Sequence, residues 1–499
     1  MLMTSALKQV SMRMSIVNTV LIRKNAVGTI MGMTIRISEK IRIENPTPAM
    51  FRWCKEHLVI DNPDYYKKER MGKWTGNIPR EIWLFERNGN ELLLPFGCLK
   101  SIWNLCVRGV PWKAEFAPLR QVNYKSSINL YPYQQKAVDE ALKRKNGVLV
   151  MPCGSGKTQS GLEFISRIGG KALWLTHTAD LLNQSRKRAE SVLGYVGTGT
   201  ITGGKVNIGN GITFATIQTM AKIDLSQYKD AWDIIVVDEC QHCCGSPTKV
   251  TQFYKVISSL SARYKIGLTA TPKRADGLER GMFALLGSII YEVPREEVAN
   301  TTCPVKVMQV NTGWHPDYDC VLLGDGTIDY HKVVDNMTQD DERFEKVIET
   351  IADIPQGEPT IVLANRVAYL QRLEEEYDKR HGGFEPSICL SNLGTSEKDR
   401  RLRKNSLSAL NDGEIDCIFA TYQLAKEGLD VPNLRYLVLA TPEKDETTVI
   451  QSVGRVGRKA EGKEYGTVID FVDDFGMYKG WAKKRANYYK KIDAELVTK

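Results

Sequence analysis

A glycine-rich loop followed by Lys-Thr is the strongest chemical signal in the sequence. "MPCGSGKT" occupies residues 151–158, directly after an apolar run that predicts a strand. Small residues let backbone N–H groups turn toward phosphates; here they are Gly154, Ser155 and Gly156. Lys157 can then reach the β- and γ-phosphate oxygens, and Thr158 can hold Mg²⁺. Met151 stands where the general pattern has glycine. The loop predicts binding of ATP and Mg²⁺.

An acidic pair at the end of a second apolar run completes this chemistry. "IIVVDECQH" places Asp238 and Glu239 about 80 residues after the loop. Asp238 is predicted to hold the Mg²⁺, and Glu239 to orient or deprotonate the attacking water. Loop and acidic pair together predict an ATP hydrolase.

Short apolar, β-branched runs alternate with helix-like segments and predict two α/β domains with parallel sheets. The runs of the first domain are 147–151, 171–176, 212–216, 233–238 and 265–269. Those of the second are 360–364, 387–390, 417–421 and 435–441. The polar, poorly periodic stretch 298–335 between them is predicted to be a linker. "GYVGTGTITGGK" (194–205) lacks the glycine spacing of a dinucleotide loop and is predicted to be a turn-rich hairpin.

Composition excludes several classes of protein. The chain has 499 residues, of which 42% are hydrophobic and 25% charged, as in ordinary soluble proteins. No apolar run approaches the ~18 residues of a membrane span, so we expect a soluble protein. Eleven scattered cysteines favour a reducing compartment over a disulfide framework.

The positive charge is concentrated near the N-terminus. Residues 1–130 carry 20 Lys+Arg against 10 Asp+Glu, and residues 131–499 carry 48 against 49. The same region holds five of the nine tryptophans. Cationic side chains beside stackable rings favour nucleic acid as the partner, and a solvated basic face is the alternative.

At this point the motifs resemble a known family. "DECQH", "GLTATPKRADGLER" (267–280) and "QSVGRVGR" (451–458), in this order, are similar to the superfamily 2 helicases and translocases of the DExH type. XPB-like proteins and the motor subunits of restriction systems share the resemblance. It implies an α/β fold of two tandem RecA-like parallel-sheet motor domains, preceded by a small α+β accessory domain.

The resemblance also implies roles for individual residues. Gln134 would read adenine, and His242 would contact the "TAT" segment that holds Thr269 and Thr271. Thr216 and Thr421 would bind the phosphates of a nucleic-acid strand. The residues implied at the nucleotide cleft of the second domain are Gly428, Asp430, Gln451, Arg455 and Arg458, with Arg458 resembling an arginine finger.

The segment 72–102, which contains "LLLPFG", resembles the small N-terminal domain of the UvsW-like phage helicases. This implies a domain that engages branched nucleic acid, with candidate contacts Lys73, Trp74, Arg80 and Lys100. "LLLPFG" itself is predicted to be packing and a turn.

These observations predict the following organisation: an extension (1–32), an accessory nucleic-acid-binding domain (33–120), motor domain 1 (121–297), a linker (298–335), motor domain 2 (336–475) and a basic C-terminal helix (476–499). The resemblance implies an ATP-dependent DNA helicase or translocase acting on branched DNA in replication, recombination or repair, in the cytoplasm of a bacterial or phage-infected cell. Its partners would be DNA and replication or recombination proteins. The alternatives are a restriction motor, an RNA helicase and a non-hydrolysing nucleic-acid clamp.

Overall fold

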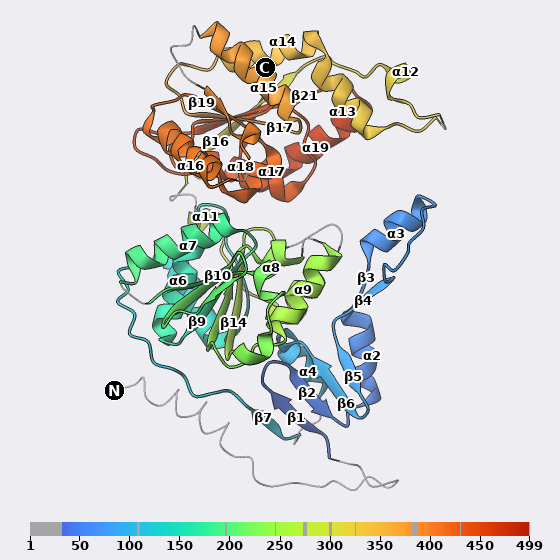
Figure 1. The fold of residues 1–499 in the computed structure, drawn as a ribbon, viewed down its shortest axis with the longest axis vertical. Coiled ribbons are helices and arrows are strands. Elements are labelled where there is room, and N and C mark those ends of the chain that lie inside the picture. The colour runs from blue at the N-terminus through green and yellow to red at the C-terminus, as the bar shows by residue number, and fades with distance from the viewer. Residues whose placement is uncertain are drawn as a thin grey trace. The chain divides into compact units, whose positions relative to one another are not determined.

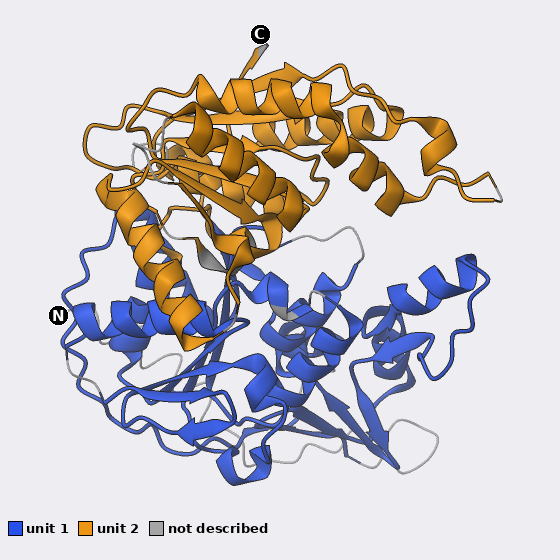
Figure 2. Ribbon diagram, turned by 45° about the horizontal axis from the view of Figure 1, so that its top comes forward, with its two compact units in different colours: residues 1–150, 158–292 blue, residues 151–157, 293–499 orange. Residues whose placement is uncertain are grey.

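The computed structural model describes residues 32–106, 110–194, 197–244, 246–272, 277–298, 302–324, 326–381, 387–394, 396–429 and 431–498. They divide into two compact units (Figures 1 and 2). The first contains the described residues of 1–150 and 158–292, and the second those of 151–157 and 293–499. The predicted extension lies outside the described residues except for Gly32.

An eight-stranded sheet forms the centre of the first unit, in the order β11-β10-β12-β9-β13-β14-β8-β15. All neighbouring strands are parallel except β10 and β11. The strands are β8 (Asn146–Val150), β9 (Ala172–Thr176), β10 (Gly199–Thr202), β11 (Lys205–Asn207), β12 (Ile212–Thr216), β13 (Ile234–Val237), β14 (Tyr264–Thr269) and β15 (Ile289–Glu292). The five predicted strands are adjacent in this sheet and almost wholly buried, which confirms the prediction from apolar runs.

Helices and short 3₁₀ turns connect these strands. They are α5 (Pro132–Arg144), α6 (Lys157–Ile168), α7 (Ala179–Val192), α8 (Ile217–Met220), η2 (Leu225–Tyr228), η3 (Cys240–Cys244), α9 (Pro247–Ile257) and α10 (Glu279–Leu286). Ordinary start signals set their bounds: Ser246 caps α9 by accepting from the Lys249 N–H at 3.2 Å. The predicted hairpin is confirmed as the antiparallel pair β10 and β11, joined by two glycines at φ 58° and 79°.

The N-terminal part of the first unit is a second, smaller sheet with strand order β5-β6-β2-β1-β7. Its strands are β1 (Thr34–Ile37), β2 (Ile41–Glu44), β5 (Glu86–Asn88), β6 (Glu91–Leu94) and β7 (Trp112–Ala114). A separate pair, β3 (Val59–Asp61) and β4 (Glu81–Trp83), carries helix α3 (Pro63–Arg70) on an arm (Figure 1). The remaining elements are α2 (Pro48–His57), η1 (Phe96–Cys98) and α4 (Leu99–Leu105).

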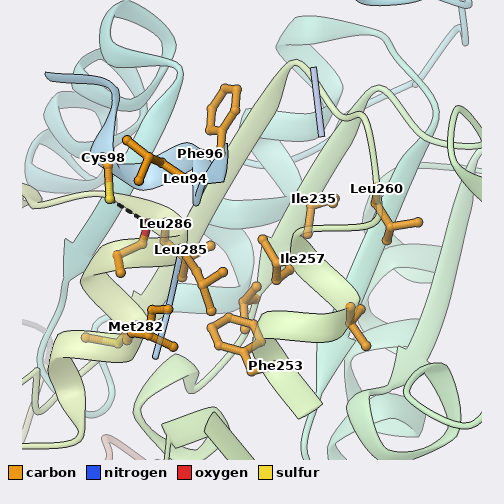
Figure 3. Close-up of a cluster of buried hydrophobic side chains, with 14 of the residues drawn as sticks. Leu94, Phe96, Cys98, Ile235, Phe253, Ile257, Leu260, Met282, Leu285 and Leu286 are labelled. Carbon is orange, nitrogen blue, oxygen red and sulfur yellow. Dashed lines mark hydrogen bonds between the residues drawn. The ribbon is translucent and has the colours of Figure 1, made fainter. Parts of the chain in front are cut away.

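The Leu-Pro-Phe-Gly turn joins the small sheet to the large one in a single core (Figure 3). Leu94 and Phe96 are buried in the same cluster as the apolar residues of α10. The Cys98 thiol donates to the carbonyl oxygen of Ala284 in α10 at 3.7 Å. The prediction that this turn is packing is therefore confirmed.

Gly97 is the point of closest approach at this seam. A Cβ on Gly97 would lie 2.6 Å from the carbonyl oxygens of Phe283 and Ala284 and would also meet the backbone nitrogen of Gly287. These are backbone atoms at the end of α10 and cannot rotate away. Only glycine fits between the turn and the helix.

A buried lysine lies at the same seam. The Lys265 ammonium, on β14, donates to the carbonyl oxygens of Glu39, Ile257 and Leu260 at 3.3, 3.1 and 2.9 Å. It also lies 4.7 Å from the centroid of the Phe96 ring. Burial lowers the pKa of Lys265 to about 7. Its three N–H donors connect the turn after β1 to the end of α9.

The second unit contains a seven-stranded, wholly parallel sheet with the order β18-β19-β17-β20-β21-β16-β22. Its strands are β16 (Val305–Asn311), β17 (Thr360–Ala364), β18 (Ser387–Cys389), β19 (Cys417–Thr421), β20 (Tyr436–Leu439), β21 (Gly466–Val472) and β22 (Glu495–Thr498). Its helices are α11 (Arg295–Val298), α12 (Tyr318–Val321), α13 (Tyr330–Gln339), α14 (Asp341–Ala352), α15 (Val367–Arg380), α16 (Glu397–Asp412), α17 (Tyr422–Gly428), α18 (Glu446–Val456) and α19 (Gly476–Lys491), with the turn η5 (Leu390–Asn392). The four predicted strands β17 to β20 are confirmed. The two parallel sheets agree with the predicted fold class.

Two predictions about the second unit are wrong. The stretch 298–335 is not only a linker, because residues 305–311 form strand β16 between β21 and β22. The C-terminal segment is not only a basic helix, because α19 ends at Lys491 and β22 follows it. One face of α19 is also buried, including Trp481 and Arg485. The helix is therefore part of the packed unit.

Two buried ion pairs connect the helices of this unit to β21 and its end. Arg343 on α14 donates to Asp473 at 2.7 Å, with both side chains fully buried. Arg485 on α19 pairs with Asp470 at 2.7 Å, with both side chains 1% exposed. Losing one partner of such a pair would leave the other charge buried and unpaired.

Candidate active site

The glycine-rich loop leaves β8 and enters α6. Gly154 and Gly156 have φ of 79° and 78°, which side-chain-bearing residues rarely adopt. The Ser155 hydroxyl donates to the carbonyl oxygen of Pro152 at 2.6 Å, which closes the turn. Lys157 is the first residue of α6 and Thr158 the second. Met151 is fully buried, so this position serves the core and not the loop.

The topology of the large sheet places the predicted catalytic residues together at the carboxyl ends of its strands. β13, β14 and β8 are neighbours and parallel, so their carboxyl ends lie together. The loop follows β8, Asp238 and Glu239 follow β13, and Thr269 ends β14. Ligands of such sheets bind at this edge.

Asp238 and Glu239 have different environments. Asp238 is 4% exposed and accepts from the Glu239 N–H at 3.0 Å and from the Ser185 hydroxyl at 3.5 Å. Glu239 has φ 46°, in the left-handed region that non-glycine residues rarely occupy. Such strain is concentrated at functional sites, and here it sets the direction of the Glu239 carboxylate.

Gln241 holds that carboxylate, a role that the sequence reasoning missed. Its amide nitrogen donates to Glu239 Oε2 at 2.8 Å, and its amide oxygen accepts from the Thr269 hydroxyl at 2.6 Å. The Thr269 hydroxyl in turn accepts from the Thr271 N–H at 3.1 Å. Gln241 and Thr269 are 1% and 0% exposed. Gln241, two residues after Glu239 in the acidic motif, thus connects Glu239 to the "TAT" segment. The contact predicted from His242 to the same segment stays a prediction.

The His242 ring lies against His177, with centroids 4.2 Å apart and planes at 31°. His177 follows β9, and burial, with a smaller contribution from the charge of His242, lowers the pKa of His177 to about 3. A neutral His177 ring can therefore pack on His242 without charge repulsion. This packing connects the acidic motif to the segment after β9.

Gln134 is 1% exposed on α5. Its amide oxygen accepts from the Tyr131 N–H at 2.9 Å, which fixes the start of the helix. The Tyr131 ring is stacked on Tyr133, with centroids 5.7 Å apart, and is 52% exposed. The role of Gln134 in reading adenine stays a prediction.

In the second unit, three of the five predicted nucleotide-cleft residues lie on or just after α18. These are Gln451, Arg455 and Arg458. The Arg455 guanidinium donates to the carbonyl oxygens of Ala425, at 2.6 Å, and Leu429, which lie at the end of α17. Gly428 is the last residue of α17, and Asp430 lies outside the described residues. Their roles at a nucleotide stay predictions.

Thr216 and Thr421, the predicted phosphate contacts, each end a strand and precede a helix. The Thr216 hydroxyl shares a hydrogen bond with Thr219 at 2.9 Å, and Thr216 is 6% exposed. The Thr421 hydroxyl caps α17 by accepting from the Leu424 N–H at 3.3 Å and bonds to Ser391. Both threonines stand at the carboxyl edge of their own sheet.

The four candidate contacts of the N-terminal domain are exposed but do not form one cluster. Lys73, Trp74 and Arg80 lie on the arm after α3, and Lys100 lies on α4 (Figure 1). Trp74 is 85% exposed, and its ring covers Gly76, where a Cβ would lie 3.0 Å from it. Arg80 donates to the Tyr66 hydroxyl at 3.0 Å. The arm therefore carries an exposed aromatic ring and two exposed cationic side chains.

Comparison with known proteins finds one family match in each motor half of the chain. Residues 127–274 match the family described as "Type III restriction enzyme, res subunit", and residues 342–460 match the "Helicase conserved C-terminal domain". The first match contains the loop and the acidic motif, and the second contains the whole "QSVGRVGR" motif (451–458). The chain belongs to superfamily 2 of the helicases. It is an ATP-hydrolysing helicase.

The helicase has relatives over most of its length. A putative ATP-dependent RNA helicase of Acanthamoeba polyphaga mimivirus is 26% identical over 75% of this chain and 70% of its own. The ATP-dependent DNA helicase uvsW of Enterobacteria phage T4 is 23% identical over 88% of this chain and 90% of its own. A DNA-bound Type ISP restriction-modification enzyme, LlaBIII, has a similar fold, with a TM-score of 0.55 and 17% identity over 75% of this chain and 31% of its own.

Within the described residues, no helix of the helicase has the length and apolar character that crossing a membrane requires.

Proposed function

We propose that this helicase uses ATP hydrolysis to move on DNA and to unwind or branch-migrate forks, junctions and R-loops. The observation that carries the proposal is the seam at Phe96 and Gly97, which fuses the basic N-terminal domain to the ATPase sheet in one core. Movement of the motor would therefore move the N-terminal domain with it. The match to uvsW supports the same reading, because it extends over 88% of the chain.

Residues of the glycine-rich loop, of α6 and of the segment after β13 would divide the hydrolytic step among them. Lys157 and the N–H groups at the start of α6 would bind the β- and γ-phosphates. The donors near them suit a hard cation: the Thr158 hydroxyl and the Asp238 carboxylate are oxygen ligands of the kind Mg²⁺ prefers. When bound, the ion would neutralise charge that develops on the phosphate oxygens.

Glu239 would orient the attacking water and accept its proton, since Gln241 fixes its carboxylate at 2.8 Å. Gln241 would also report the state of this site to Thr269 and Thr271 through the 2.6 Å bond. Arg455 and Arg458 would supply positive charge to the γ-phosphate, a contribution of about a thousandfold or more in related hydrolases.

The arm of the N-terminal domain would contact branched DNA. Trp74 offers an exposed stacking surface, and Lys73 and Arg80 are exposed on the same arm. Backbone phosphates would supply most of the affinity, so binding should weaken steeply with salt. An exposed ring on an arm suits the point where paired nucleic-acid strands diverge.

RNA is the second candidate substrate, because the mimivirus relative is named as an RNA helicase. A restriction motor is a third, supported by the family description and the fold of the Type ISP enzyme. A non-hydrolysing clamp is disfavoured, because Lys157, Glu239 and Arg458 are all present.

Steady-state ATP hydrolysis at fixed salt tests the proposal. The purified helicase is assayed alone and with single-stranded DNA, a four-way DNA junction and single-stranded RNA. We expect the junction to stimulate most. Stimulation by RNA alone would move the substrate to RNA, and no stimulation by any would refute the motor.

The test needs matched variants. Lys157→Ala and Glu239→Gln should abolish turnover. Trp74→Ala should lower stimulation by the junction and spare that by single strands, whereas Trp103→Ala, another exposed tryptophan of the same domain at 64% exposure, should change neither. Deletion of residues 1–120 is a poorer test, because it would expose the apolar face of α10.

A further inference from the structure

A cavity of about 210 Å³ lies in the second unit, and none of the site residues predicted from the sequence lines it. Its walls come from α13, α19 and the segments that follow β17 and β20. Its polar and aromatic lining residues are Tyr330, His331, Asn365, Arg366, Glu443, Lys444 and Trp481. All of them belong to the described residues of a single unit.

The cavity stands where a parallel sheet offers a binding site. The chain leaves β17 toward β18 and β19 on one side and returns to β20 on the other. β17 and β20 are therefore the topological switch point of the sheet, and ligands bind at the carboxyl ends of such strands. Asn365 and Arg366 directly follow β17, and Lys444 follows β20.

Hydrogen bonds hold the floor of the cavity in shape. The Asn365 N–H donates to the Thr441 hydroxyl at 3.0 Å, and the Asn365 amide nitrogen donates to the carbonyl oxygen of Pro442 at 3.3 Å. These bonds join the ends of β17 and β20. The site is thus pre-formed before any ligand arrives.

The lining combines aromatic rings with cations and the Glu443 carboxylate, whose Oε1 accepts from the N–H groups of Lys444 and Asp445 at 2.7 and 2.9 Å. Tyr330 is 38% exposed, and its ring centroid lies 5.7 Å from that of the nearly buried Trp481. The Lys444 ammonium lies 5.1 Å from the Trp481 ring, and Arg366 is fixed by an ion pair to Asp335 at 2.8 Å. A nucleobase with its neighbouring phosphates matches this lining. Bases stack on aromatic side chains, and cationic side chains contact the phosphate backbone of the nucleic acid.

We infer that this cavity receives one base of a single nucleic-acid strand, stacked on the exposed Tyr330 ring, with Lys444 and Arg366 on the adjoining phosphates. The cavity is below the ~300 Å³ of sites that hold larger ligands, so it suits one base and not a free nucleoside triphosphate. This inference rests on the proposed function and adds a base contact to a motor expected to grip only phosphates.

The path expected for a nucleic-acid strand supports the assignment of the cavity to a base. Thr421, the predicted phosphate contact, ends β19, which is next to β17. β20 is the following neighbour, so the carboxyl ends of β19 and β20 are two strand spacings apart, about 10 Å at ~4.8 Å each, and Lys444 lies in the segment after β20. A strand that passes Thr421 along this edge would reach the cavity within one or two nucleotides.

The test compares two oligonucleotides with the same phosphates. The full-length helicase, without ATP and at fixed salt, is titrated with a fluorescent oligothymidylate and with an equally long abasic strand. We expect the wild type to bind the base-containing strand about tenfold more tightly, on the order of one stacked base. Tyr330→Ala should abolish that preference, Tyr330→Phe should keep it, and Lys444→Ala should weaken both strands alike.

The same sheet offers a matched control at the amino ends of its strands. The Lys306 ammonium lies 4.1 Å from the ring of Tyr465, which is 43% exposed and precedes β21. Tyr465→Ala should leave the preference for bases unchanged.

The outcomes separate the two proposals. A wild type that binds DNA but does not distinguish the strands, or a Tyr330→Ala variant that still does, overturns the base site and leaves the motor intact. A wild type that binds neither strand overturns the proposed function as well.

Discussion

Gly97→Ala should loosen the seam between the N-terminal domain and the ATPase sheet. The added Cβ would meet the carbonyl oxygens of Phe283 and Ala284 at 2.6 Å, and normal Cβ contacts begin at 3.0 to 3.4 Å. Turn and helix must therefore separate by several tenths of an ångström or more. Overpacking of this kind typically destabilises by about 1–3 kcal/mol.

The structure also sets an upper limit to that loss. If the turn left α10 altogether, Phe96 and Leu94 would be exposed, at roughly 1.5–3 kcal/mol for each side chain. For a unit of this size, 1–3 kcal/mol corresponds to a fall in Tm of about 2–12 °C.

Urea unfolding followed by circular dichroism and tryptophan fluorescence measures the effect. Gly480→Ala is the matched control, because Gly480 lies inside α19 with open space around its Cα. That change should be neutral or stabilising by up to about 1 kcal/mol. If the free energy of unfolding of Gly97→Ala lies within about 0.5 kcal/mol of the wild-type value, the N-terminal domain and the ATPase sheet are not joined at this glycine.

Three further predictions concern buried polar groups. Gln241→Leu should lower kcat about 10- to 100-fold, because a hydrogen bond to the Glu239 carboxylate contributes about 1.5–3 kcal/mol; Thr269→Val, which spares that bond, should cost less, and equal ATPase rates for Gln241→Leu and wild type would contradict the role. Lys265 has a folded pKa of about 7, below its unfolded value, so the unfolded chain binds more protons between pH 7 and 10.5 and stability should rise with pH there. The free energy of unfolding should rise by at most about 1.4 kcal/mol per pH unit, and Lys265→Met should remove this rise in urea unfolding at pH 7, 8 and 9. Parallel wild-type and variant profiles would refute the lowered pKa of Lys265. Arg343→Met should destabilise by about 3–5 kcal/mol because it strands Asp473, and Arg343→Met with Asp473→Asn should recover most of the loss in the same assay; no recovery would show that packing, not charge, carries the effect.

Much of the fold was predictable because buried parallel strands are continuous apolar runs. β8, β9, β12, β13 and β14 each read this way, and the motifs follow them at the expected edge. Strand β16 was missed because "VKVMQVN" alternates apolar and polar residues inside a polar stretch, and only Val307 is fully buried. Its place in the sheet depends on β21, far along the chain.

Side-chain partnerships were harder to foresee than elements. The sequence indicated Glu239 but not the bond from Gln241, since only the turn after β13 brings the amide to the carboxylate. The pairing of Arg343 with Asp473 joins residues 130 positions apart and has no local signal. The base cavity was equally hidden, because Tyr330 and Trp481 meet only when α13 and α19 pack together.

The position of β16 also has a consequence for synthesis. Its neighbour β21 begins at Gly466, about 150 residues after β16 ends at Asn311. At ~5–20 residues per second, a ribosome would need about 10–30 s to deliver that partner. During this interval the backbone N–H and C=O groups on both sides of β16 lack their partners in β21 and β22. Unpaired strands can associate with other chains, so we expect newly made chains to depend on chaperones at this stage.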